Sequence, residues 1–218
     1  MTRVFPALTF AVVLALFARA AGSEPPPDHT LLYELLPDSS TVRAHTGSSG
    51  LLGFAGHDHT IAVPFGGLVS IDSTDVTRCG LRITARSTAL AVIDPGEDAD
   101  KRARIEKDMH EKVLAADEFP LISFSEVRFV PEKPAPAFGS HRGELTVALT
   151  LHGVTREIRI PVTIDLDRQK LRARGKFAIK HADFNLTRIR VAGVVKVAET
   201  IDIDFDIVGQ RMIPTRGS

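Results

Sequence analysis

Apolar and polar residues alternate along much of the chain. In residues 155–167, TREIRIPVTIDLD, apolar side chains occupy every second position and mostly polar ones stand between them. Because successive side chains of a strand point to opposite faces, this pattern predicts a strand with one buried and one solvated face. Other segments repeat the pattern or are further candidates, so the predicted strands are residues 81–92, 121–130, 143–153, 155–167, 170–180 and 199–209.

The order of these segments predicts the fold class. Several predicted strands follow one another with no helix between them, which favours antiparallel pairing with one dry face. A wide sheet of this kind must protect its edges, and closure into a barrel does so. We therefore predict an all-β fold with one main helix, in which an antiparallel β-barrel encloses an apolar lumen. On its outer face, a basic stripe at 172–176 could lie beside an acidic stripe at 202–206.

One helix is predicted between the strands. Residues 94–120 open with acidic residues, which suit a helix N-terminus, and Pro120 stops any continuation. Ile105, Met109 and Val113 recur every four residues and mark one apolar face. We expect this helix to lie on or across one end of the barrel.

The N-terminal residues indicate export. Arg3 precedes a nearly continuous apolar run, residues 4–17, and small residues follow around Ala20. This pattern is typical of a secretory signal peptide, and the run is shorter than the ~20 apolar residues that span a membrane. We expect a signal peptide at residues 1–21, cleaved near Ala20, and a mature protein that is periplasmic or secreted. The sole cysteine, Cys79, cannot form an internal disulfide.

The rest of the chain suits one domain. We expect a proline-rich lead-in at residues 22–30, a barrel domain at 31–209 and a flexible tail at 210–218. Without Arg3 and Arg19 the 27 basic residues fall to 25 against 27 acidic ones, which gives a formal charge of −2. The basic residues form no single long run, which argues against nucleic-acid binding. The sequence has no nucleophile elbow, phosphate-binding loop or CxxC motif.

Histidines are the candidate polar groups of the lumen. In the stretch GHDH, read as a strand, His57 and His59 share a face with Ile61 and Val63, while Asp58 points outward. The pair could be a polar patch that contacts a ligand head group, a purely structural pair, or part of a zinc site. A zinc site would need a third protein ligand. The candidates for it are His45, His110 and His181.

Three segments carry a family pattern. Residues 143–162, GELTVALTLHGVTREIRIPV, match a G-x-L-T-x-x-G-V-T-x-x-V stretch, and residues 110–129, HEKVLAADEFPLISFSEVRF, match a helix-to-strand segment ending in P-x-I-x-F. Residues 177–186, FAIKHADFNL, are similar to an I-x-R-x-D-F-G segment, with His181 where arginine is frequent and Asn185 where glycine stands. In their order and spacing, these segments resemble the YceI-like polyisoprenoid-binding proteins.

The resemblance spans roughly Tyr33 to Val208 and implies both a fold and a function. It implies an exported, elongated, lipocalin-like β-barrel that holds a polyisoprenoid or isoprenoid-quinone chain, does no chemistry on it and needs no cofactor. Burying one CH₂ contributes ~0.8 kcal/mol, so a five-carbon isoprene unit offers roughly 3–4 kcal/mol gross. No metal ligand or catalytic residue is assigned. The predicted ligand-binding residues are Phe54, His57, His59, Ile61, Val63, Phe124, Leu149, Phe177, Ile179 and His181.

Two other functions stay open from the sequence alone. One is a zinc-dependent hydrolase or redox protein centred on GHDH, which metal analysis of the purified protein would detect. The other is a filled barrel that acts as an interaction module, from which organic extraction would release no lipid. For the lipid carrier itself, transient contact with a membrane surface and a homodimer are both open, and nucleic acid is not an expected partner.

Overall fold

The computed structural model describes residues 29–48, 58–134, 136–188, 190–191, 194–195 and 197–213, and strands dominate this part of the chain. The strands are β1 Thr30–Leu35, β2 Thr41–Ser48, β3 His59–Ala62, β4 Gly66–Asp72, β5 Cys79–Arg86, β6 Ala91–Val92, β7 Leu121–Pro131, β8 Gly139–Leu151, β9 Val154–Leu166, β10 Lys170–Lys180, β11 Arg190–Val191, β12 Val194–Val195 and β13 Val197–Arg211. The helices are α1 Ala99–Asp108, its π-helical continuation η3 Met109–Val113, and the short 3₁₀ helices η1 Pro37–Ser39, η2 Ser87–Ala89 and η4 His181–Phe184.

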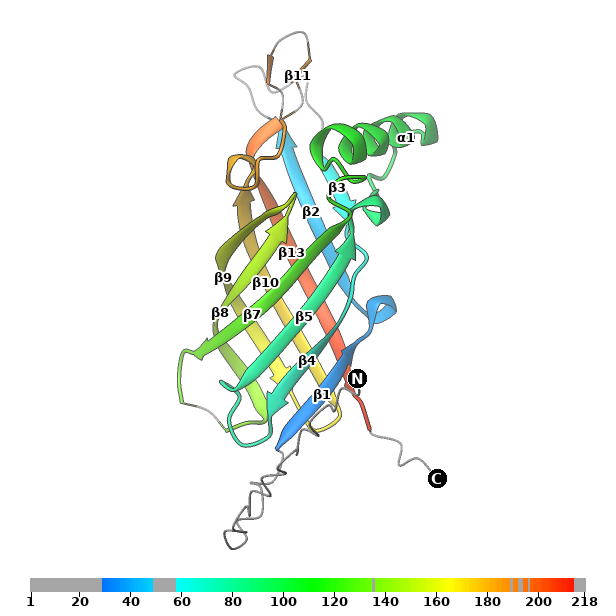
Figure 1. Ribbon diagram of the computed structural model, residues 1–218. Coiled ribbons are helices and arrows are strands. Elements are labelled where there is room, and N and C mark those ends of the chain that lie inside the picture. The colour runs from blue at the N-terminus through cyan, green and yellow to red at the C-terminus, as the bar shows by residue number, and fades with distance from the viewer. Residues whose placement is uncertain are drawn as a thin grey trace, which may run out of the picture.

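Eight strands close into a barrel. Their hydrogen-bonded order is β1-β4-β5-β7-β8-β9-β10-β13, and β13 returns to β1 through the pairing of Arg211 with Tyr33. Each pairing around this ring is antiparallel. The predicted fold class, an antiparallel β-barrel with one main helix, is therefore confirmed (Figure 1). The ring leaves no unpaired edge along its closed part, which protects the barrel against edge-to-edge association.

Interrupted strands extend the barrel at one end. β1 and β2 are separated by η1, and both pair with β13. β3 pairs with β2 while β4 pairs with β1, and the two residues of β6 pair with β3. The segment 81–92, predicted as one strand, is likewise divided into β5, η2 and β6. At this break the Ser87 hydroxyl donates to the carbonyl of Phe119 at 2.7 Å, a side-chain hydrogen bond that competes with those of the sheet.

The predicted helix lies at this same end, as Figure 1 shows. It is shorter than the segment 94–120 and begins after Asp98, whose carboxylate accepts from the backbone N–H of Lys101 at 2.9 Å. Two hydrogen bonds tie it to the strand-β6 region. The Glu106 carboxylate accepts from the N–H of Val92 at 2.8 Å, and the His110 ring donates through Nε2 to the carbonyl of Leu90 at 2.9 Å. We call this the helix end of the barrel.

The barrel wall separates a charged exterior from an apolar interior. On the outer face of β10 and β13, Arg172 makes two hydrogen bonds to Asp206, of 2.7 and 2.5 Å, and lowers the pKa of that carboxyl. Arg174 pairs with Asp165 of β9. The basic and acidic stripes thus lie side by side as expected, although exposed pairs of this kind contribute only about 0–1 kcal/mol each.

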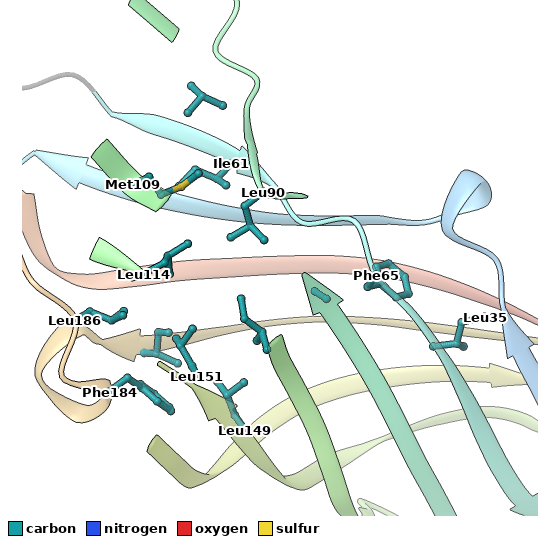
Figure 2. Packing of buried hydrophobic residues seen from close by; sticks show 14 residues of the cluster. Leu35, Ile61, Phe65, Leu90, Met109, Leu114, Leu149, Leu151, Phe184 and Leu186 are labelled. Atoms are coloured by element: carbon teal, nitrogen blue, oxygen red, sulfur yellow. The ribbon is translucent and has the colours of Figure 1, made fainter. Parts of the chain in front are cut away.

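Buried apolar side chains form two clusters along the interior. The first lies toward the helix end and includes Met109, Leu149 and Phe184. Figure 2 shows Met109 near Ile61 and Leu114 nearer to Leu186, while Leu35 and Phe65 lie further down the barrel. The second cluster packs around Tyr33, which is fully buried and donates its hydroxyl to the carbonyl of Asp167 at 2.7 Å. It is centred on Tyr33, Ile71, Phe129, Leu166 and Leu171.

Two further details concern the sequence expectations. Cys79 is a free, half-buried thiol, and burial raises its pKa. β13 continues to Arg211, two residues past the expected end of the domain at 209. In the described part of the chain, no helix is long and apolar enough to cross a membrane.

Candidate ligand cavity

The interior of the barrel holds two apolar chambers. The upper chamber, at the helix end, has a volume of about 190 Å³. The lower chamber, of about 110 Å³, lies further into the barrel. Four residues line both: Val42, Phe124, Phe177 and Ile203. The two chambers are therefore adjacent and are separated by side chains rather than by backbone.

The alternating strand pattern builds the chamber walls. On β8, Leu149 and Leu151 face the upper chamber, whereas Leu145 and Val147 face the lower one. Thr150, between two of these residues, points outward. Its hydroxyl shares a hydrogen bond with that of Thr155. An inward residue at every second position is the direct consequence of the strand repeat.

Eight of the ten residues predicted to bind ligand line the upper chamber together. They are His59, Ile61, Val63, Phe124, Leu149, Phe177, Ile179 and His181. Phe54 and His57 lie outside the described residues. Asp58 is exposed, as predicted.

The strand register brings His59 and His181 to the same end of the chamber. His59 of β3 pairs with Thr46 of β2, which pairs in turn with Ile201 of β13. Ile201 pairs with Ile179 of β10, two residues before His181. The two histidines thus lie toward the same end of this four-strand run, one on β3 and one just after β10, offset by two residues in register. The chamber's other polar lining residues, Thr46 and Thr187, lie in the same part of the fold.

Asp94 orients the ring of His59. Its carboxylate lies 2.6 Å from Nδ1 of His59 and also accepts from the backbone N–H of Thr60 at 2.6 Å. Because an ionised carboxylate only accepts hydrogen bonds, the Nδ1 atom carries the proton of this contact. Nε2 of His59 is then left for a partner in the chamber. Asp94 is buried and lies before α1, although the sequence pattern places it among the acidic residues that open the helix.

A backbone carbonyl of β13 orients the ring of His181, the first residue of η4. His181 is buried, and its Nδ1 donates to the carbonyl of Glu199 at 3.0 Å. Asn185 follows η4 and adopts the left-handed conformation, with φ 54°. Asparagine adopts this conformation more readily than most side chains. This explains how asparagine can stand where the family pattern has glycine.

The other histidine candidates for a zinc site point elsewhere. His45 lies on the outward face of β2 and its Nε2 is 2.5 Å from Asp204, while His110 uses its Nε2 on the carbonyl of Leu90. Among the residues that the structure describes, no three His, Cys, Asp or Glu side chains converge on a point where a metal ion could sit. His57, part of the zinc hypothesis, lies outside these residues.

Several lining residues were not predicted. Ile105, Met109 and Val113 of the helix close the upper chamber from above, with the apolar spacing already visible in the sequence. Ile201 and Ile203 come from the predicted inward face of β13. By contrast, β2 contributes Val42, Ala44 and Thr46, and this strand was not predicted because its alternation is weak and interrupted by small and polar residues.

Comparison with known proteins decides the family. Residues 33–209 match the sequence model of the YceI-like domain. The chain belongs to the YceI-like domain family. This confirms the resemblance that the three sequence segments indicated. No curated protein matches the chain in sequence.

Solved YceI-like structures share the barrel. BcnA of Burkholderia cenocepacia superposes with a TM-score of 0.61 at 18% identity, covering 80% of this chain and 98% of its own. A polyisoprenoid-binding domain from Saccharophagus degradans, implicated in plant cell wall breakdown, gives a TM-score of 0.59 at 14% identity and covers 84% of this chain and 99% of its own. At these identities the likeness shows the fold.

Proposed function

We propose that this YceI-like protein is an exported, non-enzymatic carrier that holds a polyisoprenoid or isoprenoid-quinone chain inside its barrel. One observation carries the proposal: among the described residues that line the two adjoining chambers, the polar ones lie at the helix end. Every described residue around the lower chamber is apolar. A lipid with a polar head and a long apolar tail fits this gradient, with the head at His59 and His181 and the tail directed inward. The Saccharophagus degradans relative, described as a polyisoprenoid-binding domain, supports the same class of ligand.

The size of the cavity suits a branched hydrocarbon tail. An apolar cavity of roughly 150 Å³ stays dry and binds benzene. The upper chamber, at about 190 Å³, is larger than this and equally apolar over most of its wall. Because each buried CH₂ contributes ~0.8 kcal/mol, a few isoprene units can offset the cost of association without any catalytic group.

The exported location is part of the proposal and rests on the N-terminal sequence pattern. Protein recovered from its native host should begin between Ala21 and Glu24, which N-terminal sequencing would read directly. Soluble protein that retains Met1 in the cytoplasm would contradict export.

Organic extraction tests the function itself. The protein should be purified from its native host without added lipid, extracted with chloroform and methanol, and the extract analysed by mass spectrometry. We expect ions spaced by isoprene units, in an amount close to one lipid per protein. An extract without lipid would favour the filled-barrel interaction module, and a stoichiometric metal found by elemental analysis would favour the zinc protein.

The two chamber histidines should strengthen binding of the head group. In the double variant His59→Ala, His181→Ala we expect affinity for geranylgeraniol to fall by about 5- to 150-fold, the equivalent of ~1–3 kcal/mol for lost buried hydrogen bonds. The apolar tail stays buried, so binding should weaken rather than disappear. Affinity would be measured by equilibrium partition of radiolabelled geranylgeraniol.

His45→Ala is the matched control for this pair. This variant also replaces a histidine with alanine at the helix end of the barrel. His45, however, lies on the outward face of β2, between the lining residues Ala44 and Thr46. Binding in this variant should stay near that of the wild type. An equal loss in His45→Ala and in the double variant would rule out a specific head-group contact in the chamber.

A further inference from the structure

Two aromatic rings, together with Val42 and Ile203, lie at the boundary between the two chambers. The rings of Phe124 and Phe177 meet edge to face, with centroids 6.4 Å apart and planes at 84°. Phe124 comes from β7 and Phe177 from β10, two strands that are separated in the ring by β8 and β9. Both rings line both chambers. The two rings therefore form the aromatic part of this boundary, and we call them the partition.

A third ring holds one side of this partition in place. The ring of Phe205 on β13 is tilted against that of Phe177, with centroids 6.4 Å apart and planes at 59°. Its ring lies directly against Gly175, where a Cβ atom would come within 2.7 Å of it and within 2.6 Å of the carbonyl oxygen of Pro161. Because Gly175 has no side chain, the Phe205 ring can occupy this space. Phe205 is fixed on the wall, and Phe177 stands between it and Phe124.

Phe177 has open space on two sides, unlike an ordinary core residue. A ring in a close-packed core can turn only by displacing its neighbours. Phe177 borders a chamber of about 190 Å³ on one side and one of about 110 Å³ on the other. A change of its side-chain rotamer can therefore place the ring in either chamber without overpacking the wall.

We propose that the Phe124–Phe177 partition sets the length of isoprenoid chain that the barrel accepts. This rests on the proposed function. By comparison with the roughly 150 Å³ cavity that holds benzene, the upper chamber accommodates about one to two isoprene units and the lower chamber about one more. A short chain fills the upper chamber and stops at the rings. A longer chain gains the lower chamber only when the Phe177 ring turns aside.

Binding of a series of alcohols to the full chain tests this inference. Prenol, geraniol, farnesol and geranylgeraniol carry one to four isoprene units on the same hydroxyl head. In the wild type we expect affinity to rise with the first units and then to level off at the partition. In Phe177→Ala the two chambers join, and affinity should keep rising for one further unit, by about tenfold or more. Phe177→Leu, which keeps more of the side-chain volume, should show a smaller shift in the same direction.

Ile179→Ala is the control. It enlarges the upper chamber without joining it to the lower one, so it separates these two effects. Ile179 lies two residues along the same strand and lines the upper chamber alone. Its truncation should change affinity for all four alcohols alike and leave the length at which affinity levels off unchanged. The same length profile in wild type, Phe177→Ala and Ile179→Ala would overturn the partition. Absence of binding of any alcohol to the wild type would instead overturn the proposed function.

Discussion

Leu149→Asp should destabilise the barrel by at least about 4 kcal/mol, because it removes a buried leucine and places a carboxyl group in an apolar chamber. Leu149 is 2% exposed on β8 and packs in the cluster at the helix end. A loss of this size is a large fraction of the 5–15 kcal/mol that typically separates a folded domain from its unfolded state. Urea denaturation followed by circular dichroism would measure the change in the free energy of unfolding.

The neighbouring residue provides the control for this variant. Thr150 points to the outer face, where its hydroxyl meets that of Thr155 at 2.8 Å. Thr150→Asp introduces the same charge one position along the strand, and we expect it to change stability by no more than about 0.5 kcal/mol. Comparable losses in the two variants would show that inward and outward positions on β8 have been exchanged.

Phe184→Ala should cost about 3–5 kcal/mol, the usual range for truncating a buried aromatic side chain. Phe184 is 1% exposed and anchors η4 in the upper cluster, next to Leu186 in Figure 2. Because η4 begins with His181, loosening this anchor should also weaken head-group binding. Thermal denaturation would report the first effect and geranylgeraniol binding of the folded variant the second.

Asp183→Ala tests whether the effect belongs to the buried ring. Asp183 shares η4, but its side chain is exposed, and only its backbone carbonyl makes the contact to Arg156. We expect stability and binding in this variant to match the wild type within error. A loss as large as that of Phe184→Ala would mean that η4 depends on its exposed turn rather than on its packing.

Strands that alternate over many residues could be predicted together with their inward faces. Leu149, Phe177 and Ile179 were assigned to the lumen from their own neighbours alone, because the two-residue repeat is a local property of a strand. The alternation around GHDH indicates a strand at the position of β3, but the sequence does not predict β1, β2 and β4. The alternation of β2 is weak, and this strand joins the barrel through its pairing with β13.

The partners of the polar residues could not be predicted in the same way. Asp94 follows His59 by 35 positions and contacts it because β6 pairs with β3 and turns the chain back. The aromatic partition depends on which residues of β7 and β10 reach the same level, and this depends on the stagger of the whole ring. Such contacts arise from the closed barrel and leave no pattern in the neighbouring sequence.

The alternation on β10 has a consequence for how such a protein can evolve. Residues that shape the chamber, such as Phe177 and Ile179, are interleaved with residues that carry the surface charge, such as Arg172 and Lys176. A substitution in one set leaves the other set untouched. Ligand preference and surface chemistry can therefore diverge independently on the same backbone, which is consistent with a barrel that this chain shares with the two solved structures above at 18% and 14% identity.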